Sequence, residues 1–195
     1  MKENKIIEWF IIFYIILFAI ISILQKNYEF FYYCIIYLLL IIIIKIYVYK
    51  HKIEIKLSKI ILLGFALLGI AHFLGAVIHI NGVRLYDTYF ILKYDNYIHA
   101  FGTFLLTFVI YDYFSPYLSP DFKKSMLKLG FLVVVFTLGI GSIIEIIEFF
   151  GIIFFKASGV GDYTNNALDQ IFNITGALTA TIIIYWHEQK NKSKQ

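Results

Sequence analysis

The stretch LKLGFLVVVFTLGIGSIIEIIEFFGIIFF, residues 127–155, decides the fold class, because it is apolar over almost its whole length. A helix needs roughly 20 apolar residues to cross a ~30 Å hydrocarbon core, and residues 127–144 alone are long enough to cross. Residues 145–155 either extend the transmembrane helix or form an interfacial one. Both alternatives place Glu145 and Glu148 near one surface of the bilayer. Ionisable groups are costly in a membrane, so both glutamates are functional candidates.

The rest of the chain has the same character. Its 195 residues are 61% hydrophobic and only 15% charged, whereas soluble domains are about half apolar and about a quarter charged. We therefore predict an all-α polytopic membrane protein, a bundle of about six transmembrane helices that forms a single integral membrane domain over residues 1–195. The predicted helices are approximately residues 6–24, 30–49, 60–80, 98–114, 127–155 and 167–186.

The distribution of basic residues predicts the orientation of this bundle. Six crossings place 13 of the 17 Lys and Arg residues on one side. Cytoplasmic loops carry the excess of Lys and Arg, so both termini are predicted to be cytoplasmic in a multi-pass protein of the cell membrane. The net charge of +4 is spread over loops and termini, which argues against a nucleic-acid partner. The single Cys34 excludes an intramolecular disulfide and a multi-cysteine metal site.

Most polar residues within or beside the apolar segments fall at the opposite, outward end. His72 lies in the segment 60–80, where it either serves a site or hydrogen-bonds a neighbouring helix. Asp95 precedes His99 by four residues, so its carboxylate can orient the imidazole if the helix begins early enough. Alternatively, Asp95 caps that helix.

Two further groups of polar residues lie at the outward end. Glu145 and Glu148 are three residues apart and share a helix face. Such a pair in a low dielectric retains a proton or recruits a cation, unless both carboxylates are solvated at a helix end. Asn165, Asp169 and Asn173 recur every four residues along the start of the last predicted helix. Because lipid does not tolerate such a polar stripe, we expect it to face the interior of the bundle.

The second half of the chain resembles the YjdF-like family of uncharacterised multi-pass membrane proteins and, more remotely, VanZ-like proteins. The resemblance rests on Asp95 with His99, on Glu145, on the pair Gly161 and Asp162, and on the pattern D-x-x-x-N-x-x-G-A at residues 169–177. Asn96 and Glu148 depart from the VanZ-like pattern, which usually has Lys and often Gln there. The resemblance implies a helical membrane protein, and it brings no settled chemistry.

Three hypotheses for function follow. The first is an enzyme acting on a lipid headgroup or lipid-linked envelope precursor from an outward-facing polar pocket between helices 3–6. The candidate residues are His99, Glu145 and Asp169 for catalysis, Asp95 and Asp162 for orientation, and His72, Glu148, Asn165 and Asn173 for the rest of the pocket. The sequence contains no H-E-x-x-H, nucleophile elbow or phosphate loop. The second hypothesis is binding or transport of a proton, cation or small molecule, and the third is a structural role in bridging helices.

The sequence does not identify a cofactor. A divalent cation such as zinc or manganese would be held by His72, His99, Glu145 and Asp169, which are suitable ligand types. These four residues are scattered over four predicted helices, so the sequence leaves metal binding open. The composition requires one partner, the lipid bilayer, and the enzyme hypothesis adds a lipid headgroup or an envelope precursor.

Overall fold

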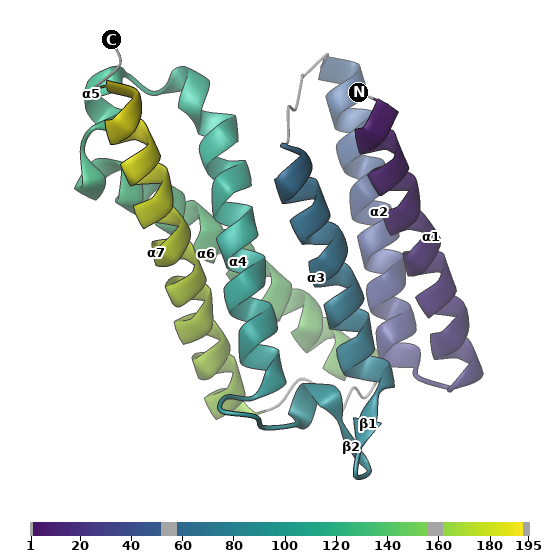
Figure 1. Cartoon of the computed structure of the whole chain (residues 1–195). Helices are drawn as coiled ribbons and strands as arrows, with labels where there is room; N and C mark the ends of the chain where they lie inside the picture. Colours follow the sequence, from purple (N-terminus) through teal and green to yellow (C-terminus); the bar gives the residue numbers. More distant parts are fainter. Residues whose placement is uncertain (1, 52–57, 156–161, 193–195) are drawn as a thin grey trace. The chain divides into compact units, whose positions relative to one another are not determined.

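The computed structural model describes residues 2–51, 58–155 and 162–192, and most of them are helical (Figure 1). The prediction of an all-α fold is confirmed. Gly161 and four lysines used in the orientation prediction lie outside the described residues; these lysines are Lys52, Lys56, Lys156 and Lys194. Contacts divide the chain into two compact units. The expectation of one integral membrane domain stays a prediction.

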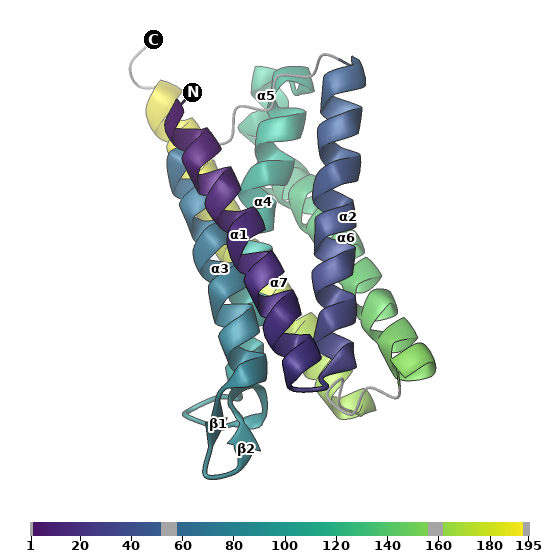
Figure 2. The same cartoon turned by 90° about the vertical axis from the view of Figure 1, so that its right-hand side faces the viewer.

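The first unit contains three long helices: α1 (Lys2–Leu24), α2 (Tyr28–His51) and α3 (Lys59–Val77). Helix α1 packs against both α2 and α3 (Figure 2). Aromatic rings fill the contact between α1 and α3, where Phe18 stacks on Phe73 with ring centroids 4.7 Å apart. Ser58 caps α3, because its Oγ accepts a 3.3 Å hydrogen bond from the backbone N–H of Ile61.

A β-hairpin follows α3, where the sequence led us to expect the helix to continue to residue 80. Strand β1 (His79–Ile80) pairs antiparallel with β2 (Val83–Arg84). The two strands are joined by Asn81 and Gly82, whose φ values are 52° and 82°. An Asn-Gly pair with positive φ is typical of a tight hairpin turn. A short 3₁₀ helix, η1 (Leu85–Asp87), completes the connection.

The second unit is built around three long helices: α4 (Tyr94–Phe114), α6 (Met126–Phe155) and α7 (Tyr163–Lys192). Helix α6 belongs to this unit up to Phe149. Helices α4 and α7 lie side by side over much of their length (Figure 1). The short elements η2 (Ser115–Tyr117) and α5 (Pro120–Lys123) connect α4 to α6. The apolar core includes Leu129 and Val133, which are fully buried against the C-terminal halves of α4 and α7.

Five of the described helices are long and apolar enough to cross a membrane; these spans are Lys5–Leu24, Lys59–Val77, Tyr94–Tyr117, Met126–Phe154 and Tyr163–Lys190. Helix α2 contributes a shorter apolar stretch, Tyr28–Ile43. The structure is therefore that of a polytopic helical membrane protein. Residues 145–155 continue α6 without a break, and the choice between a transmembrane and an interfacial position for them stays open.

Helices α4 and α7 each begin four residues earlier than predicted, and both differences concern polar residues of the candidate site. Helix α4 begins at Tyr94 instead of residue 98, so Asp95 lies in its first turn, where a carboxylate interacts favourably with the helix dipole. Helix α7 begins at Tyr163 instead of residue 167. Asp162 stabilises this start, because its Oδ1 accepts a 2.9 Å hydrogen bond from the backbone N–H of Asn165.

Candidate functional site

His99 lies between carboxylates from α4, α6 and α7. Its Nε2 is 3.5 Å from Asp95 Oδ1 and 3.7 Å from Asp169 Oδ1. Asp95 precedes His99 by one turn on α4, whereas Asp169 comes from α7. The early start of α4 is what places Asp95 one turn before the imidazole. One ring nitrogen thus faces two carboxylate oxygens that come from different helices.

The other ring nitrogen of His99 faces an amide and a third carboxylate. His99 Nδ1 lies 3.3 Å from Asn173 Oδ1, within hydrogen-bond distance. Glu145 Oε1 of α6 lies 3.7 Å from the same nitrogen. Because each nitrogen has its own pair of partners, the orientation of the imidazole is fixed on both sides.

A second layer of polar groups holds the carboxylates. The side-chain amide of Asn165 donates to Asp169 Oδ2 at 2.7 Å and to Asp95 Oδ2 at 3.3 Å. Lys93 Nζ donates to Asn165 Oδ1 at 2.5 Å and lies 3.7 Å from Asp95 Oδ2. Asn166 donates to Glu145 Oε2 at 2.8 Å. In each of these three acidic residues, one oxygen is thus held by an amide and the other faces His99.

The acidic groups are buried, and two of their oxygens lack hydrogen bonds. Asp169 is 1% exposed and Glu145 is 8% exposed. Within the described part of the chain, Asp169 Oδ1 and Glu145 Oε1 have no hydrogen-bond partner. These are the oxygens that face His99. Leaving a buried polar group unsatisfied costs roughly 1–3 kcal/mol, and more for a charged group, so this arrangement does not serve stability alone.

Helices α4 and α7 approach each other closely beside the site. At Gly176 of α7, an added Cβ atom would lie 2.1 Å from the backbone oxygen of Ala100 on α4. Glycine is therefore required for α7 to come this close to α4. Because Ala100 follows His99 and Gly176 lies three residues after Asn173, the contact sets the distance between those two side chains.

The comparisons with known proteins agree with the membrane fold. The family model described as "Predicted membrane protein (DUF2238)" matches residues 6–190. The chain belongs to this family. Searches of the curated proteins and of the solved structures found no significant match. The finer resemblance to YjdF-like and VanZ-like proteins stays a prediction, and the family description assigns no activity to this member.

Two other predicted site residues, Asp162 and Glu148, differ in their burial. Asp162 is exposed, and its carboxylate caps the N-terminus of α7. Asn165 lies in the turn that Asp162 caps, and an orienting role for Asp162 stays a prediction. Glu148 is half-buried on α6, one turn after Glu145. Asn165 and Asn173, by contrast, contact the cluster directly.

His72 lies in the first unit among aromatic rings. Its Nδ1 shares a hydrogen bond with the hydroxyl of Tyr86 in η1. The ring of Phe30 on α2 lies 5.7 Å from the imidazole, measured between centroids, and that of Tyr37 lies 5.8 Å from it. The alternative in which His72 bridges neighbouring elements therefore accounts for its described contacts.

Sequence reasoning did not select Lys93 or Asn166. Lys93 was one of the few basic residues on the outward side of the predicted topology, and it stands two positions before Asp95. An outward lysine so close to an acidic residue could therefore have indicated that Lys93 belongs to the site. Asn166 lies in a polar run with Asn165, but the sequence could not show that it faces α6 while its neighbour faces α4.

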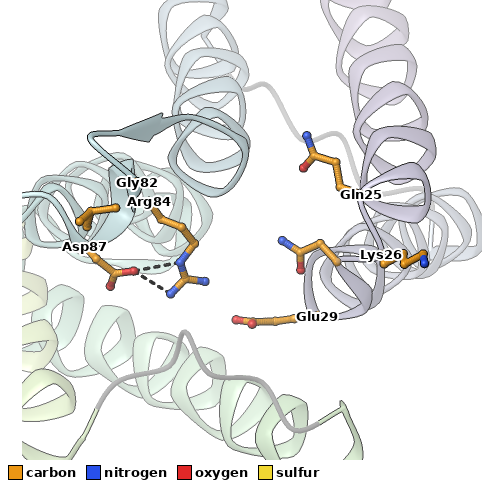
Figure 3. A pocket seen from close by; sticks show the side chains of 8 residues that line it. Gln25, Lys26, Glu29, Gly82, Arg84 and Asp87 are labelled. Carbon is orange, nitrogen blue, oxygen red and sulfur yellow. Dashed lines mark hydrogen bonds and ion pairs between the residues drawn. The ribbon is translucent and has the colours of Figure 1, made fainter.

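The first unit also contains a polar hollow of about 620 Å³, between the α1–α2 turn and the hairpin (Figure 3). Glu29 lies on one side of it, and Arg84 and Asp87 lie on the other. Arg84 and Asp87 form an ion pair of 2.8 Å. Because these charges neutralise each other, the hollow offers weaker electrostatic binding than the buried cluster around His99.

Proposed function

We propose that the chain is a membrane enzyme that uses the groups around His99 for acid–base chemistry on a polar headgroup of a lipid or lipid-linked envelope substrate. The observation that carries this proposal is the convergence of Asp95, Glu145 and Asp169 on one imidazole. General acid–base catalysis requires a titratable group that is held in position by partners and lies within reach of a substrate. His99 and Glu145 are the candidate proton acceptors.

The balance of energies supports a catalytic over a purely structural role. Hydrogen bonds between transmembrane helices contribute on average ~0.6 kcal/mol. Glu145 Oε1 and Asp169 Oδ1 are buried without hydrogen bonds from the residues that the structure describes, and this costs more than such bonds return. A cluster selected only to bridge helices would satisfy these oxygens. A site that must exchange protons or receive a ligand keeps them available.

The location of the cluster supports a substrate at the membrane surface. Asp95 and Asn165 lie in the first turns of α4 and α7, whose N-terminal ends meet at the same end of the unit (Figure 1). The excess of basic residues in the other loops supports the assignment of this end as the outward one. A headgroup in the outer leaflet would lie at this depth, whereas its acyl chains would remain in lipid. The proposed pocket would open here.

Reconstitution into vesicles tests the proposal. The purified full chain is placed in vesicles of bacterial total-lipid extract, and headgroup phosphorus is followed by ³¹P NMR and mass spectrometry. We expect a new headgroup species or a released water-soluble phosphate compound with the wild type. We expect the change to be at least about a hundredfold slower with His99→Gln, because general acid–base groups typically contribute ~10²–10⁴-fold.

Asp112→Asn is the matched control, because Asp112 is an exposed acidic residue at the other end of α4. It should behave as the wild type. An unchanged lipid profile with the wild type, or equal rates for the wild type and His99→Gln, would contradict the enzyme. In that case the same buried carboxylates would favour the second candidate, a protein that binds or transports protons or cations.

A further inference from the structure

We infer that Asp95, His99 and Asp169 form a binding site for a divalent metal ion of the Mn²⁺ or Zn²⁺ class. The ligand atoms would be Asp95 Oδ1, His99 Nε2 and Asp169 Oδ1. The inference deepens the proposed function and rests on it for what the ion does in catalysis. Metal binding itself can be measured without a substrate.

The distances fit such an ion. One ligand atom from each of the three side chains lies within 4.8 Å of the others, and the two distances from His99 Nε2 are 3.5 and 3.7 Å. Metal–ligand bonds of about 2.0–2.2 Å place two ligands of a tetrahedral ion about 3.4 Å apart. The two distances from His99 Nε2 are within about 0.3 Å of this separation, and binding an ion would draw the two carboxylate oxygens, which lie within 4.8 Å of each other, closer together.

The second layer has the form that metal sites require. Ligating carboxylates are normally hydrogen-bonded through their other oxygen, and a ligating His donates its second N–H to an acceptor. Here Asn165 holds Oδ2 of both aspartates. His99 Nδ1 faces Asn173 Oδ1 at 3.3 Å. The hydrogen bonds thus engage one atom of each side chain, and the other atom of each is the proposed ligand.

Charge and burial supply an independent argument. Asp95, Glu145 and Asp169 bring three carboxylates into a buried cluster, and the nearest ammonium group in the described contacts is that of Lys93. If the carboxylates are ionised, one lysine leaves an excess of negative charge. Desolvated charges are expensive unless paired, and a divalent ion would neutralise the excess. Asp169 Oδ1 is buried and, among the described residues, has no hydrogen-bond donor.

The ligand set differs from the one expected from the sequence. Glu145 faces the Nδ1 side of His99, away from the nitrogen proposed to bind metal. His72 has Tyr86 as its hydrogen-bond partner. Three protein ligands would leave coordination positions for water or a substrate oxygen, as in catalytic metal sites. With Nε2 on the metal, Glu145 becomes the remaining candidate for the proton acceptor.

Titration with Mn²⁺ tests the inference. The full chain in detergent is stripped with EDTA, freed of chelator and titrated with Mn²⁺, and free ion is read by its EPR signal; Zn²⁺ is added as competitor. We expect about one ion per chain, displaced by Zn²⁺ if both occupy the three-ligand site. His99→Gln and Asp169→Asn should weaken binding at least tenfold, and Asp112→Asn should not.

Two results would overturn the metal site: no saturable uptake of either ion by the wild type, or uptake that is unchanged in His99→Gln and Asp169→Asn. If a ligand variant fails to fold, Asn165→Ala replaces it, because this change removes only the second layer. The vesicle assay separates the two proposals. Headgroup conversion that persists in EDTA would support the enzyme without the metal, and stoichiometric Mn²⁺ without conversion would support the metal without the enzyme.

Discussion

Asn165 Nδ2 donates a 2.7 Å hydrogen bond to Asp169 Oδ2, four residues later on α7. The same amide reaches Asp95 on α4, so one side chain orients two carboxylates from different helices. This relationship makes Asn165 a positioning residue for the site. It also shows that the polar stripe on α7 faces α4.

Replacing Asn165 by Ala should weaken Mn²⁺ binding by about 10- to 100-fold, the usual cost of losing a second-layer partner. Both aspartates would lose their common hydrogen-bond donor while all three proposed ligands remain. The measurement is the EPR titration described above. Asn166→Ala is the matched control, because Asn166 donates to Glu145 and not to a proposed ligand. Equal losses in the two variants would argue against the assigned roles.

Gly176→Ala should destabilise the chain by roughly 1–3 kcal/mol, as expected for an overpacked contact. The added methyl group would meet the backbone oxygen of Ala100, which cannot move without shifting α4. Thermal unfolding in detergent measures the effect. Gly139→Ala is the control, since nothing lies within 4 Å of an added Cβ atom there. If both variants unfold at the wild-type temperature, the close approach of α4 and α7 is not as described.

The buried hydrogen bond between Thr107 on α4 and Thr137 on α6 should contribute little to stability. The two hydroxyl oxygens are 3.0 Å apart, and each hydroxyl can instead donate its single proton to a carbonyl of its own helix. A double-mutant cycle with Thr107→Val and Thr137→Val should give a coupling of ~0.6 kcal/mol. A coupling above about 2 kcal/mol would undermine the argument that bridging alone is a weak reason for buried polar groups.

The predicted orientation can be tested with single cysteines. In a Cys34→Ala background, Ile91→Cys introduces a thiol at an exposed position before α4, and Asp121→Cys introduces one after it. A membrane-impermeant maleimide should label Ile91→Cys in intact cells and Asp121→Cys only after permeabilisation. The reverse pattern would place the His99 cluster at the cytoplasmic surface and exclude an outer-leaflet substrate.

The membrane fold was readable from the sequence because long apolar runs have few alternative structures. The residues at which the helices begin were harder to predict from the sequence. Hydropathy alone excluded Tyr94 and Tyr163 from α4 and α7, although Asp95 in a first turn and Asp162 as a cap favour these starts physically. The Asn81-Gly82 turn was hidden because the apolar run before it continues to Ile80.

The candidate site was predictable in its residue types but not in its pairing. The spacing of Asp95 and His99, and of Asn165, Asp169 and Asn173, follows from helix periodicity. Which nitrogen of His99 faces which carboxylate depends on the packing of α4 against α7. That packing is set by the contact of Gly176 with Ala100, which no local pattern reveals.

We propose that the buried carboxylates around His99 serve chemistry at the expense of stability. The most direct test is the unfolding temperature of Asp169→Asn in detergent with EDTA present. The amide oxygen can still accept from Asn165, and the change removes a buried acidic oxygen that has no hydrogen bond within the described residues. We predict an unfolding temperature equal to or above that of the wild type. A fall of more than about 5 °C, corresponding to one or two kcal/mol, would mean that Asp169 holds the fold together and would contradict the account.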